Sequence, residues 1–279
     1  MDTAKPADMV ASLVDASVKK LALSPRDMLI RGAMSGALLG ATTSFSFTAA
    51  VSTGQQFIGA MVFPAGFAMI MVLGLEIVTG NFALLPLASM EGKSLWSSVI
   101  ASWYWVFLGN LLGAMSFGAL LAITLTSMGA AEPTAVAARI VAAAEMKTVA
   151  NEALGNAGMI TVFVKGILCN WLVCLGVVMA VTSGSTVGKI LVAWLPIVTF
   201  VALGFEHSVV NMFVIPTGML LGAKVSLSQW WMWNQIPVTL GNIVGGFFFT
   251  GLGLYFTYRP ATKKAAVTAL PVGAPALAE

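Results

Sequence analysis

Charged residues are scarce in this chain. Asp, Glu, Lys and Arg make up 9% of its 279 residues, and the mean hydropathy is +0.93. A soluble domain carries about 25% charged residues. The shortage excludes an ordinary soluble domain and predicts a protein that crosses a membrane several times. The net charge of +3 is also too small to predict nucleic-acid binding.

Residues that build metal centres and nucleophilic sites are equally few. The chain has one histidine, which cannot supply an ordinary histidine-rich zinc site, and it contains no G-x-S-x-G motif. Its two cysteines, Cys169 and Cys174, lie five residues apart in one apolar segment. On a helix they would point in different directions, so we expect buried thiols and no disulfide. We therefore expect no metal, no cofactor and no enzymatic activity.

The two ends of the chain differ from its middle. Residues 1–27 contain eight charged side chains and no apolar core, which excludes a cleaved signal peptide. Residues 259–279 are rich in Ala and Pro, and we expect a disordered cytoplasmic tail there. Within 7–23 one stripe is apolar, which predicts an amphipathic helix that lies on the membrane surface or docks on the cytoplasmic mouth. The stripe consists of Val10, Val14, Val18 and Leu21.

The middle of the chain, residues 28–258, contains long apolar segments. A transmembrane helix needs about 20 apolar residues, and six segments reach that length. The second and fifth are too long for one straight crossing, so each predicts two half-helices around a break. Irregular backbone is tolerated at membrane depth only where it is buried or lines a cavity. We therefore expect the breaks to line a transport path. The six segments are 28–51, 57–90, 95–126, 157–182, 190–223 and 228–257.

A pattern occurs twice in these segments. LGLE at 73–76 and LGFE at 203–206 place a Glu in each break, and each Glu is followed by an Asn and a Pro at matched spacing. Three spans per half is an odd number, so the repeats, about 28–126 and 157–257, would run in opposite directions. Such an inverted repeat with two broken helices is typical of transporters. The matched pairs are Glu76 and Glu206, Asn81 and Asn211, and Pro86 and Pro216, each 130 positions apart.

The distribution of basic residues predicts the orientation. With the N-terminus inside, ten Lys and Arg residues lie on the cytoplasmic side and four lie outside. Cytoplasmic segments carry the excess of Lys and Arg in membrane proteins. The sequence therefore predicts a multi-pass protein of the inner (plasma) membrane with both termini in the cytoplasm.

The break residues carry the candidate chemistry. His207 follows Glu206, and an ionisable residue at membrane depth is costly and by default functional. An imidazole exchanges protons near neutrality; the alternative is a structural histidine bonded to backbone. Ile77 stands where the first repeat would match His207, so proton chemistry is asymmetric. We expect Glu76 and Glu206 to act as scaffold, bonding exposed backbone amides at the breaks.

The residues after each break begin a new helix. Thr79, Gly80 and Asn81 stand there in the first repeat, and Ser208 stands there in the second. A helix N-terminus has free N–H groups and a partial positive charge. Two such ends that face the membrane midplane would form a site for a small anion.

Four stretches resemble the formate/nitrite transporter family, and together they extend over nearly all of 28–257. They are EIVTGN at 76–81, KGILCNWLVC at 165–174, GFEHSVVNMFVIP at 204–216 and NQIPVTLGN at 234–242. The resemblance implies an all-α, aquaporin-like fold of six transmembrane helices. It also implies a homopentamer in membrane lipid, with one path per protomer for small anions such as formate, nitrite, acetate, lactate or hydrosulfide.

The resemblance also implies roles for individual residues. His207 would be the central histidine, Asn170 would face it, and Thr79 would lie nearby. Hydrophobic constrictions would be formed by Phe63, Phe67, Ile77 and Phe200.

The chain departs from the family pattern at one position. A lysine of the family vestibule aligns without gaps to Leu154. Lys147 lies seven residues upstream. Either the loop carries an insertion and Lys147 takes that role, or the protein lacks this vestibule charge. Lys165 matches a different basic residue of the family, at the start of the next helix.

These features lead to a hypothesis of proton-linked transport. A bare carboxylate is costly to move into an apolar path, whereas the neutral acid loses most of that penalty. Burial raises the pKa of the acid, so a proton from His207, or from water through it, would favour crossing. Alternatively, His207 only donates hydrogen bonds and low pH acts by gating. The remaining alternatives are another weak-acid anion and an aquaporin-like channel for neutral solutes, although paired Asn-Pro-Ala breaks are absent.

Overall fold

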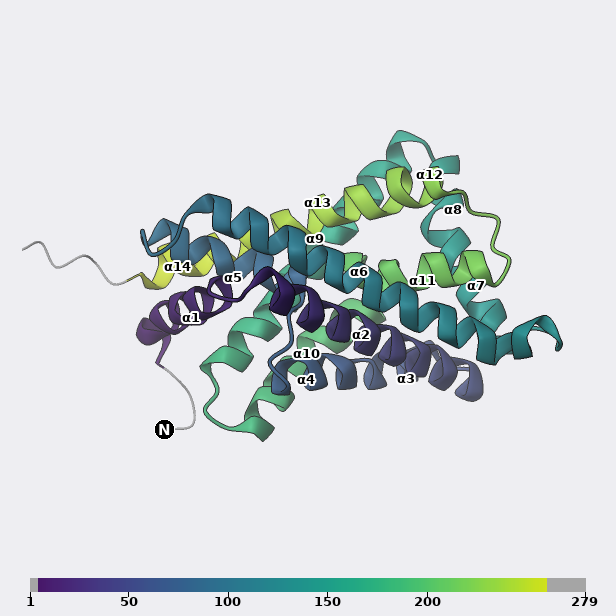
Figure 1. Ribbon diagram of the computed structural model, residues 1–279, viewed down its shortest axis with the longest axis horizontal. Coiled ribbons are helices and arrows are strands. Elements are labelled where there is room, and N and C mark those ends of the chain that lie inside the picture. Colours follow the sequence, from purple (N-terminus) through teal and green to yellow (C-terminus); the bar gives the residue numbers. More distant parts are fainter. Residues whose placement is uncertain (1–4, 260–279) are drawn as a thin grey trace, which may run out of the picture.

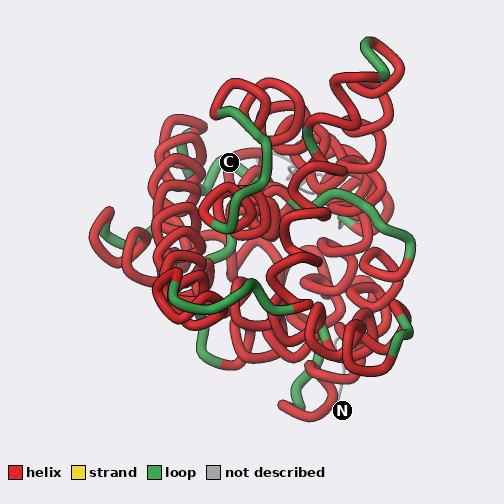
Figure 2. The backbone as a smooth tube through the Cα atoms, turned by 90° about the vertical axis from the view of Figure 1, so that its right-hand side faces the viewer, coloured by secondary structure: helices red, strands yellow, loops and turns green. Residues whose placement is uncertain are grey.

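The computed structural model describes residues 5–259, and that range is built from helices and connecting loops (Figure 2). The predicted tail at 260–279 lies outside the described residues. The all-α prediction is confirmed. The α-helices are α1 (Pro6–Leu21), α2 (Pro25–Thr53), α3 (Gln56–Val62), α4 (Pro64–Val72), α5 (Val78–Met90), α6 (Trp96–Thr126), α7 (Ala135–Lys147), α8 (Val149–Ala153), α9 (Asn156–Thr182), α10 (Thr186–Ala202), α11 (Ser208–Leu220), α12 (Leu227–Trp230), α13 (Ile236–Val244) and α14 (Gly253–Tyr258). A short 3₁₀ helix, η1 (Ser127–Gly129), follows α6, and two π-helical segments, η2 (Trp231–Gln235) and η3 (Gly245–Leu252), flank α13.

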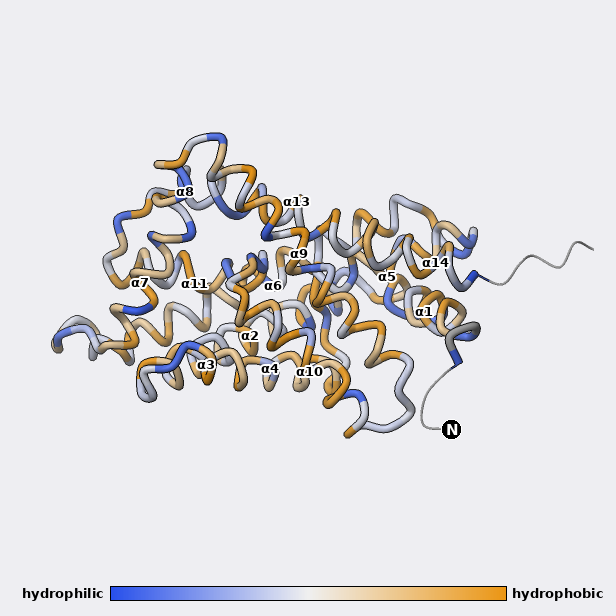
Figure 3. The backbone as a smooth tube through the Cα atoms, turned by 180° about the vertical axis from the view of Figure 1, so that it is seen from behind, coloured by the Kyte–Doolittle hydropathy of each residue, from blue (hydrophilic) through white to orange (hydrophobic). Residues whose placement is uncertain are grey.

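Within residues 5–259, three continuous helical stretches are long and apolar enough to cross a membrane: Trp96–Gly129, Asn156–Thr182 and Leu227–Tyr258. Helix α2 has 29 residues but many Ser and Thr, which lower its hydropathy. The predicted segments 57–90 and 190–223 each contain shorter apolar helices. Polar segments are most frequent at the two ends of the long axis, near α1 and near α7 and α8 (Figure 3).

Two long helix pairs form the body of the molecule. Helix α2 packs along α6, and α9 packs along α13 (Figure 1). At Gly36 an added Cβ would overlap the backbone carbonyl of Asn110, and at Gly245 it would overlap that of Ile167. Only glycine allows such close backbone approach. The face of α2 that carries Gly32, Gly36 and Gly40 therefore packs closely on its neighbours.

Helix α1 docks against α5 rather than standing apart from the bundle (Figure 1). Val10, Leu13 and Val14 are buried at this contact. The Ser17 hydroxyl donates a hydrogen bond to the backbone oxygen of Leu84 at 2.7 Å. Val18, part of the predicted stripe, is 36% exposed, so the buried face is rotated toward Leu13 and Ser17.

The two helix breaks have the same local structure. Five residues separate α4 from α5, and five separate α10 from α11. The φ angles of Gly74 and Gly204 are 63° and 66°, in the left-handed region that glycine adopts without strain. The next residues, Leu75 and Phe205, donate their N–H to carbonyls five residues back at 3.0 Å, which ends each helix in a Schellman motif. The chain then runs extended before the next helix begins.

We expect Gly36→Ala to destabilise the protein, because its methyl group would press on the Asn110 backbone. Overpacking of this kind typically costs about 1–3 kcal/mol. Gly176→Ala in α9 is the matched control, since the nearest atom to its added Cβ is 3.5 Å away. Thermal unfolding of the detergent-solubilised variants compares the two, and equal midpoints would contradict the close packing.

Candidate functional site

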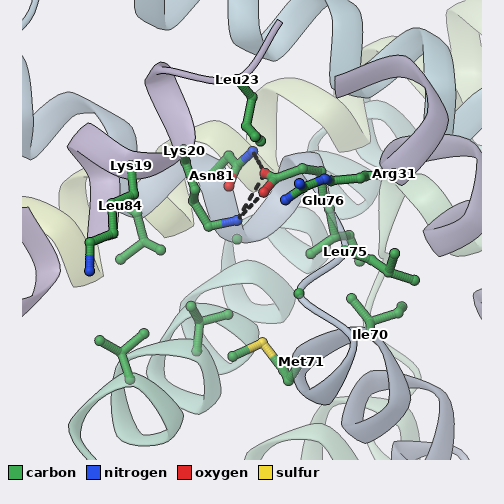
Figure 4. A pocket seen from close by; sticks show the side chains of 15 residues that line it. Lys19, Lys20, Leu23, Arg31, Ile70, Met71, Leu75, Glu76, Asn81 and Leu84 are labelled. Atoms are coloured by element: carbon green, nitrogen blue, oxygen red, sulfur yellow. Dashed lines mark hydrogen bonds and ion pairs between the residues drawn. The ribbon is translucent and has the colours of Figure 1, made fainter. Parts of the chain in front are cut away.

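The first break centres on a buried carboxylate with two partners. Glu76 is 3% exposed, and the Asn81 amide donates to its Oε2 at 2.8 Å. The Lys20 ammonium, which comes from α1, lies 2.8 Å from both carboxylate oxygens (Figure 4). Helix α1 therefore supplies the counter-charge for the first break.

The second break repeats this arrangement. Glu206 is 5% exposed, and the Asn211 amide donates to its Oε2 at 2.7 Å. The Lys147 ammonium, at the end of α7, donates to the same oxygen at 2.8 Å. Each break carboxylate thus pairs with a break asparagine and a lysine from a helix outside the repeats. A buried charge is tolerated when it is paired and hydrogen-bonded in this way.

The backbone groups at the breaks are held by two further asparagines, not by the glutamates. Asn110 accepts from Val78 N at 3.0 Å and donates to the carbonyls of Gly32 at 2.9 Å and Glu76 at 3.0 Å. This corrects the expectation that the Glu side chains bond the free backbone amides. The carboxylates pair with the lysines. Neutral amides, with both donor and acceptor, serve the backbone.

Asn242 makes the matching set of bonds at the second break. It accepts from Ser208 N at 2.9 Å and donates to the carbonyls of Gly166 at 2.8 Å and Glu206 at 3.0 Å. This role was not predicted for either asparagine from the sequence. The available signal was the repeated Leu-Gly-Asn in 108–113 and 240–245.

His207 and Thr79 join the two breaks. The Thr79 Oγ1 lies 3.1 Å from the His207 Nε2. The His207 Nδ1 accepts a hydrogen bond from Val210 N at 3.3 Å and so caps the start of α11. With Nδ1 as acceptor, the proton of the neutral ring lies on Nε2 and points to the Thr79 hydroxyl. The hydroxyl hydrogen of Thr79 then remains able to donate elsewhere.

Asn170 lies behind Thr79. Its amide nitrogen donates to the backbone oxygens of Thr79 at 3.0 Å and Asn242 at 2.6 Å, and so links the two halves. The Cys174 thiol also donates to the Thr79 carbonyl, at 3.3 Å. The hydrogen bonds of the Asn170 side chain therefore run to the backbone of Thr79 and Asn242.

The predicted constriction residues divide between two places. The Phe63 and Phe200 rings meet edge to face at 5.7 Å between centroids, and Phe200 stacks on His207 at the same distance. Ile77 lies apart from these rings and lines a separate cavity next to α1. Phe67 is 3% exposed and lines neither cavity.

Two cavities lie on either side of these residues. The α7-side cavity has a volume of about 650 Å³ and is lined by Phe63, Phe200, Glu206 and His207. The α1-side cavity, of about 230 Å³, is lined by Glu76 and Ile77 (Figure 4). Both contain three basic side chains. They are Arg139, Lys147 and Lys165 on the α7 side, and Lys19, Lys20 and Arg31 on the α1 side.

The candidate positions for a vestibule lysine differ in whether they reach a cavity. Lys147 lines the α7-side cavity, whereas Leu154 is 63% exposed and contributes to neither cavity. Lys165 lines the same cavity. Lys20 and Arg31 on the other side were not singled out from the sequence, because they lie in a polar stretch that looked like an ordinary charged helix face and span start.

We expect Asn242→Ala to destabilise the protein strongly, because it leaves Ser208 N and the Glu206 carbonyl at the break without their partner and removes the bond to Gly166 of α9. Each unpaired buried backbone group costs about 1–3 kcal/mol. Asn110→Ala should have a similar effect, since it makes the same three bonds at the other break. Thermal unfolding in detergent measures both, and unchanged midpoints would show that these asparagines do not hold the breaks.

Comparison with known proteins agrees with this architecture. Residues 7–256 match the family model described as "Formate/nitrite transporter". A probable formate transporter of Methanothermobacter thermautotrophicus is 41% identical over 71% of this chain and 73% of its own length. The formate channel FocA of Escherichia coli K12 is 28% identical over 92% of this chain and 95% of its own.

Solved structures show the same fold. One titled "FNT family ion channel" superimposes with a TM-score of 0.78 at 27% identity, covering 90% of this chain and 98% of its own. Another, titled "Pentameric formate channel with formate bound", gives 0.67 at 25% identity, covering 84% and 97%. The apolar helices and these relatives identify a membrane protein whose family consists of transporters and channels. The chain belongs to the formate/nitrite transporter family.

Proposed function

We propose that this protein carries formate, or a similar small anion of a weak acid, across a membrane between its two cavities. The observation that carries the proposal is a basic cavity on each side of an apolar region in which the side chains of the two breaks meet at Thr79 and His207. Cavities of one charge concentrate an anion of the opposite charge. Relatives named as formate channels support the choice of formate.

We infer the membrane topology from the matched breaks. Glu76 and Glu206 are each bound by one Asn and one Lys. This agreement between the halves supports an inverted repeat of six spans with two broken helices. The α1-side cavity then faces the cytoplasm, as do both termini in the inner membrane. The solved structure titled as a pentameric formate channel supports a homopentamer, in which each protomer would have its own path.

The substrate crosses the apolar region as the neutral acid. Phe63, Phe200 and Ile77 offer no charge partner, and an isolated carboxylate is costly there. Burial raises the pKa of the substrate acid, so the anion takes up a proton as it leaves the basic cavity. Transport is therefore coupled to protons through the substrate itself.

His207 acts as a neutral donor at the centre of the path. Its Nδ1 accepts the hydrogen bond from Val210 N that caps α11, and its Nε2 proton points to Thr79. A second proton on Nδ1 would break the cap and place a positive charge at the positive end of α11. Of the two roles considered, the hydrogen-bond pattern supports donation of a hydrogen bond over a relay, with cavity water as the proton source.

Uptake of labelled formate by proteoliposomes at pH 5.5 and 7.5 tests the function. We expect saturable uptake in the wild type that rises by up to about 100-fold at the lower pH, because the neutral acid increases tenfold per pH unit. Nitrite and lactate as competitors identify the substrate. If nitrite moves and formate does not, the choice of substrate is wrong.

His207→Asn separates a donor from a relay. Asn is a good helix N-cap and replaces the bond to Val210, but it cannot reach Thr79 as the imidazole does. A donor role predicts uptake lowered by about tenfold, the value of one hydrogen bond, with the same dependence on pH. Loss of the pH dependence would support a relay, and wild-type rates at both pH values would remove His207 from the path.

Thr79→Val, compared with Thr79→Ser, tests the hydroxyl. Valine keeps the shape but removes the group that accepts from His207 and donates to the substrate, so uptake should fall by about tenfold. Serine keeps the hydroxyl and should stay within about twofold of the wild type. Equal rates for Val and Ser in the proteoliposome assay would contradict a polar role for Thr79.

A further inference from the structure

Asn234 is a buried amide for which neither the sequence motifs nor the proposed path gives a role. It lies on the π-helical segment η2 and is 0% exposed. Its nitrogen donates to the backbone oxygen of Lys147 at 3.0 Å, and its oxygen accepts from the Asn211 amide at 2.8 Å. π-Helical turns inside longer helices are frequent at functional sites.

These bonds close a ring through the second break. Asn211 donates to Glu206 as well as to Asn234, and the Lys147 ammonium donates to the same Glu206 oxygen at 2.8 Å. Asn234 completes the ring by binding the backbone of Lys147, and its nitrogen also lies 3.4 Å from the Glu206 Oε2. Each amide can satisfy the ring in only one orientation, because only its nitrogen donates.

The bond to Lys147 falls at the end of a helix. Lys147 is the last residue of α7, and the chain leaves helical geometry at Thr148, with φ −124° and ψ −79°. The last carbonyls of a helix lack partners within it. The carbonyl of Lys147 is taken by Asn234 and by the Asn151 amide at 2.8 Å. Asn234 thereby anchors the end of α7 to the break.

The first repeat has no such anchor. Ser102 precedes Asn234 by 132 positions, the same offset that separates Asn110 from Asn242. Ser102 is buried, and its hydroxyl has no hydrogen-bond partner among residues 5–259. On that side Lys20 instead places its ammonium against both oxygens of Glu76. The additional amide is therefore particular to the α7-side cavity.

We propose that Asn234 is a positioning residue for anion binding: it holds Lys147 so that the ammonium binds Glu206 and still presents donors to an anion in the α7-side cavity. An ammonium has three donors, and one hydrogen bond from Lys147 goes to Glu206. The inference rests on the proposed function and assigns this residue to substrate capture on one side of the membrane.

A double-mutant cycle in formate-transporting proteoliposomes tests this role. Lys147→Gln should raise KM about tenfold for flux that enters from the α7 side, the value of one charge-assisted hydrogen bond. Asn234→Ala should raise the same KM with kcat within about twofold, and the double variant should resemble Lys147→Gln alone. KM for flux from the α1 side should not change. Ser102→Ala is the matched control and should leave both KM values unchanged.

Additive effects of the two substitutions would overturn the proposal, as would equal KM changes for both directions of flux. Asn234→Asp keeps the shape of the side chain and removes its donor, so it provides the same test if the alanine variant does not fold. An aspartate variant with wild-type KM would overturn the role as well. A wild type that moves neither formate nor nitrite nor lactate would remove the proposed function together with this inference, whereas unchanged Asn234 variants of a transporting wild type remove the inference alone.

Discussion

Free backbone groups at the two helix breaks are the constraint on which the rest of the structure depends. An interrupted helix inside an apolar bundle leaves N–H and C=O groups that no water can satisfy at low cost. Asn110 and Asn242 each take two of these groups, and a third bond from each, to Gly32 in α2 or Gly166 in α9, fixes α2 to α6 and α9 to α13. The glycines at these helix contacts follow from the same demand, because the amides reach their targets only when the backbones approach closely.

Charge is the second constraint. Two carboxylates are buried at the breaks, and each pairs with a lysine that comes from outside the two repeats. Lys20 arrives on α1 and Lys147 at the end of α7, so an ion pair joins each of these peripheral helices to a break. The same lysines line the cavities, which combines structural neutralisation of Glu76 and Glu206 with attraction of an anion from either side.

Much of the arrangement at the breaks could be predicted from the sequence, because the two halves carry the same residue types at matched positions. The matched Glu, Asn and Pro positions predicted both breaks, and the family resemblance predicted that Thr79 lies near the lone histidine. The partners of those residues could not be predicted. Lys20 and Lys147 lie in polar stretches with no counterpart in the repeat, so only folding brings them to Glu76 and Glu206. Asn110 stands in a repeated Leu-Gly-Asn pattern, but its three backbone bonds depend on the break being opposite it.

The pairing of Lys20 with Glu76 has a consequence for any shortened form of the protein. Residues before α2 lie outside the two repeats, although α1 docks against α5. Removing them would also remove the only cation that this structure places against the first buried carboxylate within residues 5–259. An unpaired buried charge is strongly destabilising and recruits either a proton or a solvent cation. A chain that begins at α2 would therefore differ from the full protein in the charge balance at its first break, and not only in length.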